Sequence, residues 1–296
     1  MQKMKIKDSI GVKTFRVINT ILLCLLVFIT FYPIYHVLMA SFSDGNALMA
    51  HRGIMYKPIN FSTDAYKAIF EKPYLFRSYA NTIYICVVTL ALNIVLTSFA
   101  AYFLTRKEAV GRKAIMMLIL FTMYFNGGLV PTYMVIRNMG LLDSFWAIIL
   151  PAAISTYNMI VLRTSFASIP ESLYEAARID GAGHFRILFQ IIMPLTKATL
   201  AVVVLYYLVS HWNSWFNASI YIDDRNKYPL QLYLREILIE NDQGATDQLL
   251  TDSDRQSVSE TLKYAMITVA TVPVLCVYPF LQKYFAKGVM IGAVKG

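Results

Sequence analysis

Long apolar stretches constrain the fold of this chain more than any other feature. They run near 17–41, 80–104, 114–136, 145–163, 197–217 and 263–285. A helix needs about 20 apolar residues to cross a bilayer, and each stretch is close to that length. The chain is 57% hydrophobic and 15% charged, whereas a soluble domain is about a quarter charged. The sequence therefore predicts an all-α, polytopic membrane protein with about six transmembrane helices and no soluble domain.

The third stretch carries residues that interrupt a helix. Asn126, Gly127, Gly128 and Pro131 lie inside it. Irregular backbone is tolerated at membrane depth only where it is buried in protein or lines a wet cavity. We therefore expect the helix to end near Phe125, with the following residues lining a cavity or a surface loop.

Basic residues predict the orientation of the chain. The formal net charge is +9, from 27 Lys and Arg against 18 Asp and Glu. Clusters of Lys and Arg flank alternate apolar stretches, notably in residues 1–16 and 105–113. Such clusters mark cytoplasmic loops, so both termini are expected in the cytoplasm. The charge is therefore a topology signal, and nucleic-acid binding is not expected.

Motifs for catalysis, nucleotide binding or metal binding are missing from the sequence. It contains no GxxxxGK[ST], HExxH, GxSxG or CxxC pattern, and Cys24, Cys86 and Cys276 are scattered through apolar runs. We predict no catalytic residue and no metal site. Carboxylates are almost missing from the apolar stretches, which disfavours a pump coupled to protons or sodium. Energy for any transport must then come from another subunit.

Residues 164–196 form the most informative loop, and we call this segment the 164–196 loop. Pro170 suits the first turn of a helix and Ser168 is a candidate cap. Gly181 and Gly183 are expected to end that helix because glycine permits a positive φ. The apolar positions predict a first helical face and then a second helix; they are Leu173, Ala176, Ala177 and Ile179, followed by Phe185, Leu188, Phe189 and Ile192. Spacing alone fits an ordinary interfacial amphipathic helix equally well.

The residue pattern of this loop adds a specific signal. It contains a Glu-Ala-Ala triplet, an Asp-Gly-Ala turn and a closing proline, which are Glu175, Ala176, Ala177, Asp180, Gly181, Ala182 and Pro194. The whole pattern resembles the loop by which ABC importer permeases bind their ATPase subunits. The resemblance implies a cytoplasmic coupling helix-turn-helix in a type I importer permease fold.

The end of the chain carries a second resemblance. Residues 288–296 form a glycine-punctuated tail with Gly288, Gly292, Lys295 and Gly296. With the preceding residues, this tail resembles the ending of carbohydrate (maltose-type) permeases, and most closely the branch for complex oligosaccharides. The resemblance places the tail at the interface between two ATPases. We expect a cytoplasmic segment over 1–16, a permease domain over 17–287 and a cytoplasmic tail over 288–296.

The family resemblance implies the other components of the assembly. They are a second, homologous permease in a heterodimer, two ABC ATPase subunits, and an extracellular or periplasmic sugar-binding protein. ATP and Mg²⁺ would be used by the ATPases, and this chain would bind no cofactor. The expected location is the bacterial cytoplasmic (inner) membrane, and the expected substrate is an oligosaccharide. Alternatives are an ABC importer for a different solute, or a self-contained secondary carrier.

A sugar pathway needs aromatic faces and amide or hydroxyl groups inside the helix bundle. Polar residues within membrane helices face the bundle interior or a wet cavity. The candidates are Asn93, Tyr124, Asn126, Tyr157, Asn158, Tyr206, Trp212, Asn213 and Asn217. For the tyrosines the alternative is an interfacial belt, and for the asparagines it is hydrogen bonding between helices.

Overall fold

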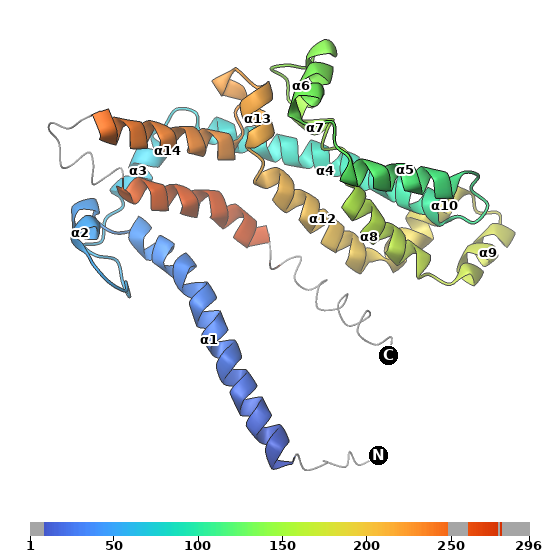
Figure 1. Cartoon of the computed structure of the whole chain (residues 1–296), viewed down its shortest axis with the longest axis horizontal. Helices are drawn as coiled ribbons and strands as arrows, with labels where there is room; N and C mark the ends of the chain where they lie inside the picture. Colours follow the sequence, from blue (N-terminus) through green and yellow to red (C-terminus); the bar gives the residue numbers. More distant parts are fainter. Residues whose placement is uncertain (1–8, 248–259, 278, 280–296) are drawn as a thin grey trace. The chain divides into compact units, whose positions relative to one another are not determined.

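The computed structural model describes residues 9–247, 260–277 and 279 (Figure 1). Every regular element in this part of the chain is helical. The chain divides into two compact units, of which one holds residues 1–72 and 241–269 and the other holds 73–240 and 270–296. The predicted tail at Gly288–Gly296 lies outside the described residues.

The first unit is organised by one long helix. Its elements are α1 (Ile10–Ser41), α2 (Gly45–Ala50), α3 (Asp64–Phe70) and the first part of a helix over Glu260–Val277. Helix α1 is apolar on all sides, and its large side chains are mostly exposed. Aromatic residues join the segments: the Tyr35 hydroxyl donates to the Tyr56 carbonyl at 2.7 Å, and the His36 and Tyr264 rings meet edge-on at 5.9 Å.

The second unit contains the remaining elements, with α14 only as far as Glu240. They are α4 (Leu75–Thr105), α5 (Arg112–Tyr124), α6 (Leu129–Asn138), α7 (Trp146–Ile149), α8 (Thr156–Ala167), α9 (Glu171–Ile179), α10 (His184–Ile187), the π-helical turn η1 (Leu188–Ile192), α11 (Met193–Leu195), α12 (Lys197–Trp212), α13 (Phe216–Tyr221), the 3₁₀ turn η2 (Arg225–Lys227) and α14 (Leu230–Asp247). Helices α4, α8 and α12 pack against one another (Figure 1).

A buried cluster at one end of these three helices fixes the 164–196 loop. It joins Tyr102 of α4, Phe166 of α8 and Tyr207 of α12 to Ile187 and Ile192 of the loop. Phe166 and Ile187 have no exposed surface. Since burying a large apolar side chain stabilises a fold by about 1.5–3 kcal/mol, this cluster ties the base of the loop firmly to the helices.

The predicted membrane spans agree with the structure in part. Three helices are long and apolar enough to cross a bilayer: α1, α4 and the helix over Glu260–Val277. The described residues give up to five spans if each of two bent pairs counts as one. In the first pair, α5 and α6 meet at 112°, which confirms the predicted break near Phe125. Gly128, with φ of 89°, allows this reversal.

The predicted span over 145–163 is wrong as one continuous helix. The chain forms α7 and α8 there, with irregular backbone from Leu150 to Ser155. Pro151 cannot donate a helical hydrogen bond, and Ser155 caps α8 by accepting from the Asn158 N–H. A count of six spans is therefore not reproduced in the described residues.

Candidate functional site

Helix α9 packs one face against the second unit and exposes the other. Its buried residues are Tyr174 and Ala177. Leu173 is 44% exposed and Ile179 is 86% exposed, and Ala176 is exposed as well. Three of the four residues of the predicted apolar face are therefore open to another surface. Ala177 departs from the prediction, because it is buried in the same cluster as Tyr174.

The exposed side of α9 carries most of the predicted docking residues. Glu175, Ala176 and Asp180 are exposed, and Gly181 follows them at the surface. Helix α9 lies beyond the ends of α8 and α12 (Figure 1). An exposed helix with a small alanine on its outer face allows close approach of another protein surface.

Helix α9 begins and ends at well-defined residues. Pro170 occupies the N-cap position, with Glu171 in the first turn. The predicted cap by Ser168 is wrong, because Ser168 ends α8 and its hydroxyl donates to the Ser165 carbonyl at 2.7 Å. Proline fits here because it lacks the N–H that the first turn of a helix leaves without a partner.

Gly181 ends α9 in a Schellman motif. The Ala182 N–H donates to the Ala177 carbonyl at 2.9 Å, and the Gly181 N–H donates to the Arg178 carbonyl at 3.0 Å. These two bonds require a left-handed residue between them, and Gly181 has φ of 77°. Ala182 packs against the same buried cluster as Ala177. The Asp-Gly-Ala sequence is therefore a rigid turn. Gly183 has φ of −74°, so the positive φ expected there is absent.

The chain returns through α10, η1 and α11. The residues Leu188 and Ile192 are buried, whereas Phe189 is 46% exposed. The π-helical turn ends just before Pro194. A proline cannot donate to the carbonyl four residues earlier and its ring crowds that carbonyl, and π turns are one way in which a helix accommodates such a defect. The bend of 88° between His184–Leu195 and Lys197–Trp212 lies at Thr196, two residues after Pro194.

A polar cluster ties α9 to the turn after α4. The Tyr174 hydroxyl donates to Glu108 Oε1 at 2.5 Å, and Arg178 lies 3.7 Å from the same oxygen. The Arg106 guanidinium stacks over the Tyr174 ring at 4.2 Å. The hydrogen bond from Tyr174 lowers the pKa of Glu108, with help from the Glu108 N–H and the two arginines. Burial, and then the bond to Glu108, raises the pKa of Tyr174.

Two further contacts complete this cluster. His184, at the start of α10, lies with Nδ1 3.1 Å from the Tyr102 hydroxyl. Lys107 pairs with Glu171 at 2.8 Å. We did not predict from the sequence that residues 106–108 hold helix α9, because we interpreted the basic residues of 105–113 only as a topology signal. The signal available in the sequence was the Arg-Lys-Glu run at 106–108, since α9 carries its own charged residues that can pair with it.

The predicted sugar-pathway residues fall into two groups. The first group is buried, and two of its members, Asn93 and Trp212, are bonded within the protein. Asn93 has no exposed surface, donates to the Ala152 carbonyl at 2.7 Å and lies 2.6 Å from His211 Nε2. The indole of Trp212 donates to the Ala270 carbonyl at 3.0 Å. Asn158 is 5% exposed. The Asn93–His211 contact joins α4 to α12, which fits the alternative of hydrogen bonding between helices for Asn93.

The second group is open to the surroundings. The Tyr157 and Tyr206 rings lie 6.2 Å apart and are 54% and 42% exposed. Tyr124, Asn126 and Asn213 are exposed, and Asn217 is half-buried. The structure therefore brings together one aromatic pair from α8 and α12. Their place on a sugar pathway remains a prediction.

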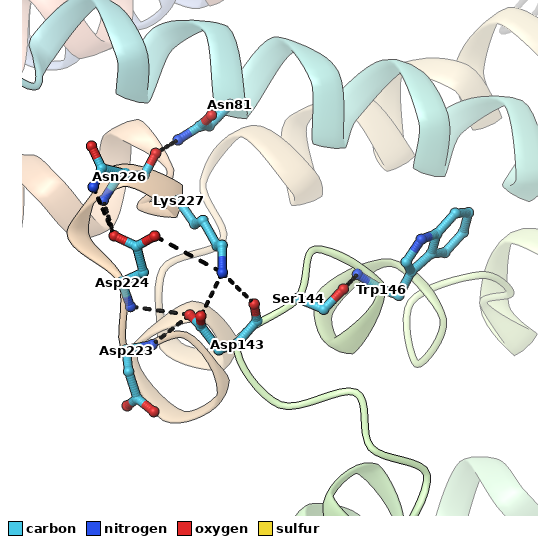
Figure 2. A network of polar contacts seen from close by, with 8 residues as sticks. All are labelled: Asn81, Asp143, Ser144, Trp146, Asp223, Asp224, Asn226 and Lys227. Atoms are coloured by element: carbon cyan, nitrogen blue, oxygen red, sulfur yellow. Dashed lines mark hydrogen bonds and ion pairs between the residues drawn. The ribbon is translucent and has the colours of Figure 1, made fainter.

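A second polar network joins segments at another part of this unit (Figure 2). Asp143 accepts from the N–H groups of Asp223 and Asp224 at 3.2 and 3.0 Å and forms an ion pair with Lys227. Asn81 of α4 donates to the Asn226 carbonyl at 2.8 Å. The hydrogen bonds from Lys227 and these backbone groups lower the pKa of Asp143. The network holds the 222–228 segment in a fixed shape.

A family model described as "Binding-protein-dependent transport system inner membrane component" matches residues 93–291, which include the whole 164–196 loop. The chain belongs to this family. It is an inner-membrane transport component, as the sequence predicted. The permease family assignment also accounts for the helical character of every regular element in the described residues.

Relatives of this permease are similar over most of their length. The chain is 41% identical over 264 residues to the polygalacturonan/rhamnogalacturonan transport system permease protein YtcP of Bacillus subtilis (strain 168), covering 89% of this chain and 92% of YtcP. It is 41% identical over 270 residues to protein LplC of the same organism, covering 90% of each chain.

Solved structures agree with the family assignment. A chain from a bacterial ABC transporter involved in the import of the acidic polysaccharide alginate matches with a TM-score of 0.82 and 31% identity, covering 95% of this permease and 100% of that chain. This match confirms the predicted fold of a type I ABC importer permease. A second alginate ABC transporter chain, at 17% identity and a TM-score of 0.59, supports the fold alone.

Proposed function

We propose that this chain is the permease subunit of an ATP-driven ABC importer that moves oligosaccharides across the cytoplasmic membrane. One observation carries the proposal. Helix α9 presents Glu175 and Ala176 outward, while Tyr174 and the Gly181 turn hold it rigidly from behind. A docking element that transmits force needs this combination of an open outer face and a fixed inner face.

In this proposal the 164–196 loop is the coupling site for an ATPase subunit in the cytoplasm. The predicted contact residues are Glu175, Ala176, Ala177, Asp180, Gly181, Ala182 and Pro194, with the 288–296 tail at the interface between two ATPases. The chain itself has no phosphate-binding motif, so ATP and Mg²⁺ belong to the ATPases. Both termini are placed in the cytoplasm, following the basic segments.

The mechanism follows from how the loop is anchored. Closure of the ATPases on ATP would displace α9. Because Tyr174 is bonded to Glu108 next to α4, and Ile187 and Ile192 are buried against α4, α8 and α12, the displacement would pass to those helices. The helices would then alternate between inward-open and outward-open arrangements. ATP shifts this equilibrium only by its differential contacts in the two states.

The substrate is assigned from relatives and from one aromatic pair. The relatives include a polygalacturonan/rhamnogalacturonan permease and a chain of an alginate importer, so an oligosaccharide is the class that fits. The exposed Tyr157 and Tyr206 rings offer apolar faces against which a sugar can stack. A second, non-identical permease and a sugar-binding protein outside the membrane complete the proposed assembly.

The test is a gentle detergent purification of the tagged chain from its host, with mass spectrometry of the proteins that accompany it. We expect an ABC ATPase, a second permease and a sugar-binding protein. The complex is then reconstituted in proteoliposomes and supplied with oligogalacturonides or neutral oligosaccharides, with and without ATP. Recovery of the chain alone, with transport that needs no ATP, would contradict the proposal and favour a secondary carrier.

A further inference from the structure

A cavity of about 520 Å³ lies between the end of α4, the start of α5 and the start of α9. Basic side chains dominate its lining: Arg106, Lys107, Arg112, Lys113 and Arg163. Glu171 is the acidic residue of the lining, and it is already paired with Lys107 at 2.8 Å. Glu108, next to the cavity, is shared by Tyr174 and Arg178. The cavity therefore keeps a surplus of positive charge.

Arg106 is held in place by its neighbours at the edge of this cavity. The Arg106 Nη1 atom is buried and has no hydrogen-bond partner among the described residues. The other side of the same guanidinium donates to Thr105 Oγ1, at 3.3 Å from Nε and 3.4 Å from Nη2. The guanidinium also lies over the rings of Tyr102 and Tyr174, at 5.0 and 4.2 Å. The Arg106 charge therefore stays beside the cavity with no carboxylate bonded to it among the described residues, and it favours an anion there.

The backbone at the start of α5 adds to this preference. Helix α5 begins at Arg112, and its N-cap residue Gly111 provides no side-chain hydrogen bond. The first N–H groups of a helix have no partner within the helix and carry a partial positive charge. Phosphate groups bind well at such a position. The first turn of α5 contains no acidic residue that would occupy it.

Apolar surface on the same helix points to the source of the anion. Met116 and Met117 also line the cavity, and Met117 is 71% exposed. Under the proposed function, the start of α5 lies at the cytoplasmic surface of the membrane. Basic pockets beside membrane helices on that side bind anionic lipid head groups. We propose that this cavity binds the phosphate of an anionic phospholipid, whose acyl chains lie along α5 past Met117.

This proposal takes one point from the proposed function, which is that the start of α5 lies on the cytoplasmic side of the membrane. Because Glu171 and Tyr174 of α9 line the same cavity, a bound head group would hold α9 against α5. The chemistry alone also fits a soluble phosphate, so the experiment must separate the two sources.

The experiment measures lipids retained by the purified importer complex, using native mass spectrometry after exchange into phosphatidylcholine with phosphatidylglycerol. The test variant is Arg112→Gln with Lys113→Gln. The matched control is Arg186→Gln with Lys197→Gln, which removes two basic residues that do not line the cavity. Each Lys or Arg near an anionic membrane surface raises the affinity for that surface several-fold. We expect the test variant to lose roughly tenfold in phosphatidylglycerol retention and the control to match the wild type.

Other results would overturn the proposal. Equal retention by the test variant and the wild type would show that the cavity does not hold the lipid. Protection of the wild type against heating by inorganic phosphate, lost in the test variant and without specific lipid retention, would assign the site to a soluble anion. If the test variant loses the ATPase subunits but retains lipid normally, Arg112 and Lys113 contact the ATPase and do not bind lipid.

Two readouts keep this test independent of folding and of the proposed function. Arg112→Lys preserves the charge and should keep the lipid, so it shows whether a loss reflects charge or misfolding. ATPase subunits that fail to accompany the wild-type chain would contradict the proposed function, while the lipid measurement on the chain would still decide the site.

Discussion

The Tyr174 hydroxyl donates to Glu108 Oε1 at 2.5 Å, which joins helix α9 to the turn between α4 and α5. The two residues are 66 positions apart in the sequence. Tyr174 is 5% exposed, and Arg106 stacks on its ring. This contact holds α9 against the end of α4, and the coupling role that we propose for α9 requires such an attachment.

Removing this hydroxyl should weaken the hold on α9. Tyr174→Phe keeps the ring and its stacking with Arg106 but loses the bond to a carboxylate. We expect the free energy of unfolding to fall by about 1 kcal/mol. A double-mutant cycle with Glu108→Ala, measured by thermal unfolding in detergent, should show a coupling of similar size. Additive effects of the two substitutions would mean that the contact contributes nothing to stability.

The turn at Gly181 offers a prediction with its own matched control. Gly181 has φ of 77° and Gly183 does not have a positive φ, while a Cβ atom at either position would meet nothing within 4 Å. Gly181→Ala should cost about 1–2 kcal/mol because an L residue is strained in the left-handed region. Gly183→Ala should be close to neutral.

For both variants we would measure the amount of the chain in the membrane and the amount of ATPase subunit that is recovered with the tagged chain. We expect both variants to reach the membrane and Gly181→Ala alone to lose ATPase. Equal recovery from the two variants would argue that the left-handed turn is not needed for docking.

The two groups of predicted sugar-pathway residues should respond differently to substitution. Tyr206→Leu removes one ring of the exposed Tyr157–Tyr206 pair, and uptake of a labelled oligosaccharide should fall by about three- to tenfold. Asn93→Leu deprives His211 and the Ala152 carbonyl of their partner. It should lower the melting temperature, with a loss of about 1 kcal/mol, and keep the preference among sugars unchanged. A changed sugar preference in Asn93→Leu would place Asn93 on the pathway.

The Asp143 network should depend on pH in a defined direction. Its hydrogen bonds with Lys227 and the Asp224 and Asp223 N–H groups hold the pKa of Asp143 below the usual value of about 3.9. A lowered folded pKa gives stability that is present above the unfolded pKa and is lost as pH falls through the folded value. Protection of the 223–228 amides from hydrogen exchange, corrected for intrinsic rates, should persist from pH 7 to about 4 and fall below it.

Two variants test this prediction at neutral pH. Asp143→Asn removes the charge that Lys227 faces, so it should expose the same amides at pH 7. Asp223→Asn makes the same chemical change at an exposed residue and should leave them protected. Equal protection in both variants would show that other contacts hold this segment.

Some features followed from local sequence alone. The apolar stretches at 17–41 and 80–104 became α1 and α4, because a long apolar run has few stable conformations other than a helix in lipid. The break near Phe125 and the turn at Gly181 were also predictable. Glycine and proline act on their own backbone, so their effects do not depend on distant residues.

The tertiary structure decided which residues of those helices are buried. The burial of Tyr174 and Ala177 on α9 was not predictable, because Tyr174 is held by Glu108 and Arg106 and periodicity carries no information about such distant partners. Asn93 is likewise bonded to Ala152 and His211, where composition allowed a sugar contact equally well. The sequence by itself determined the long apolar helices α1 and α4 and the left-handed turn, whereas contacts between distant segments determined which side chains the 164–196 loop presents.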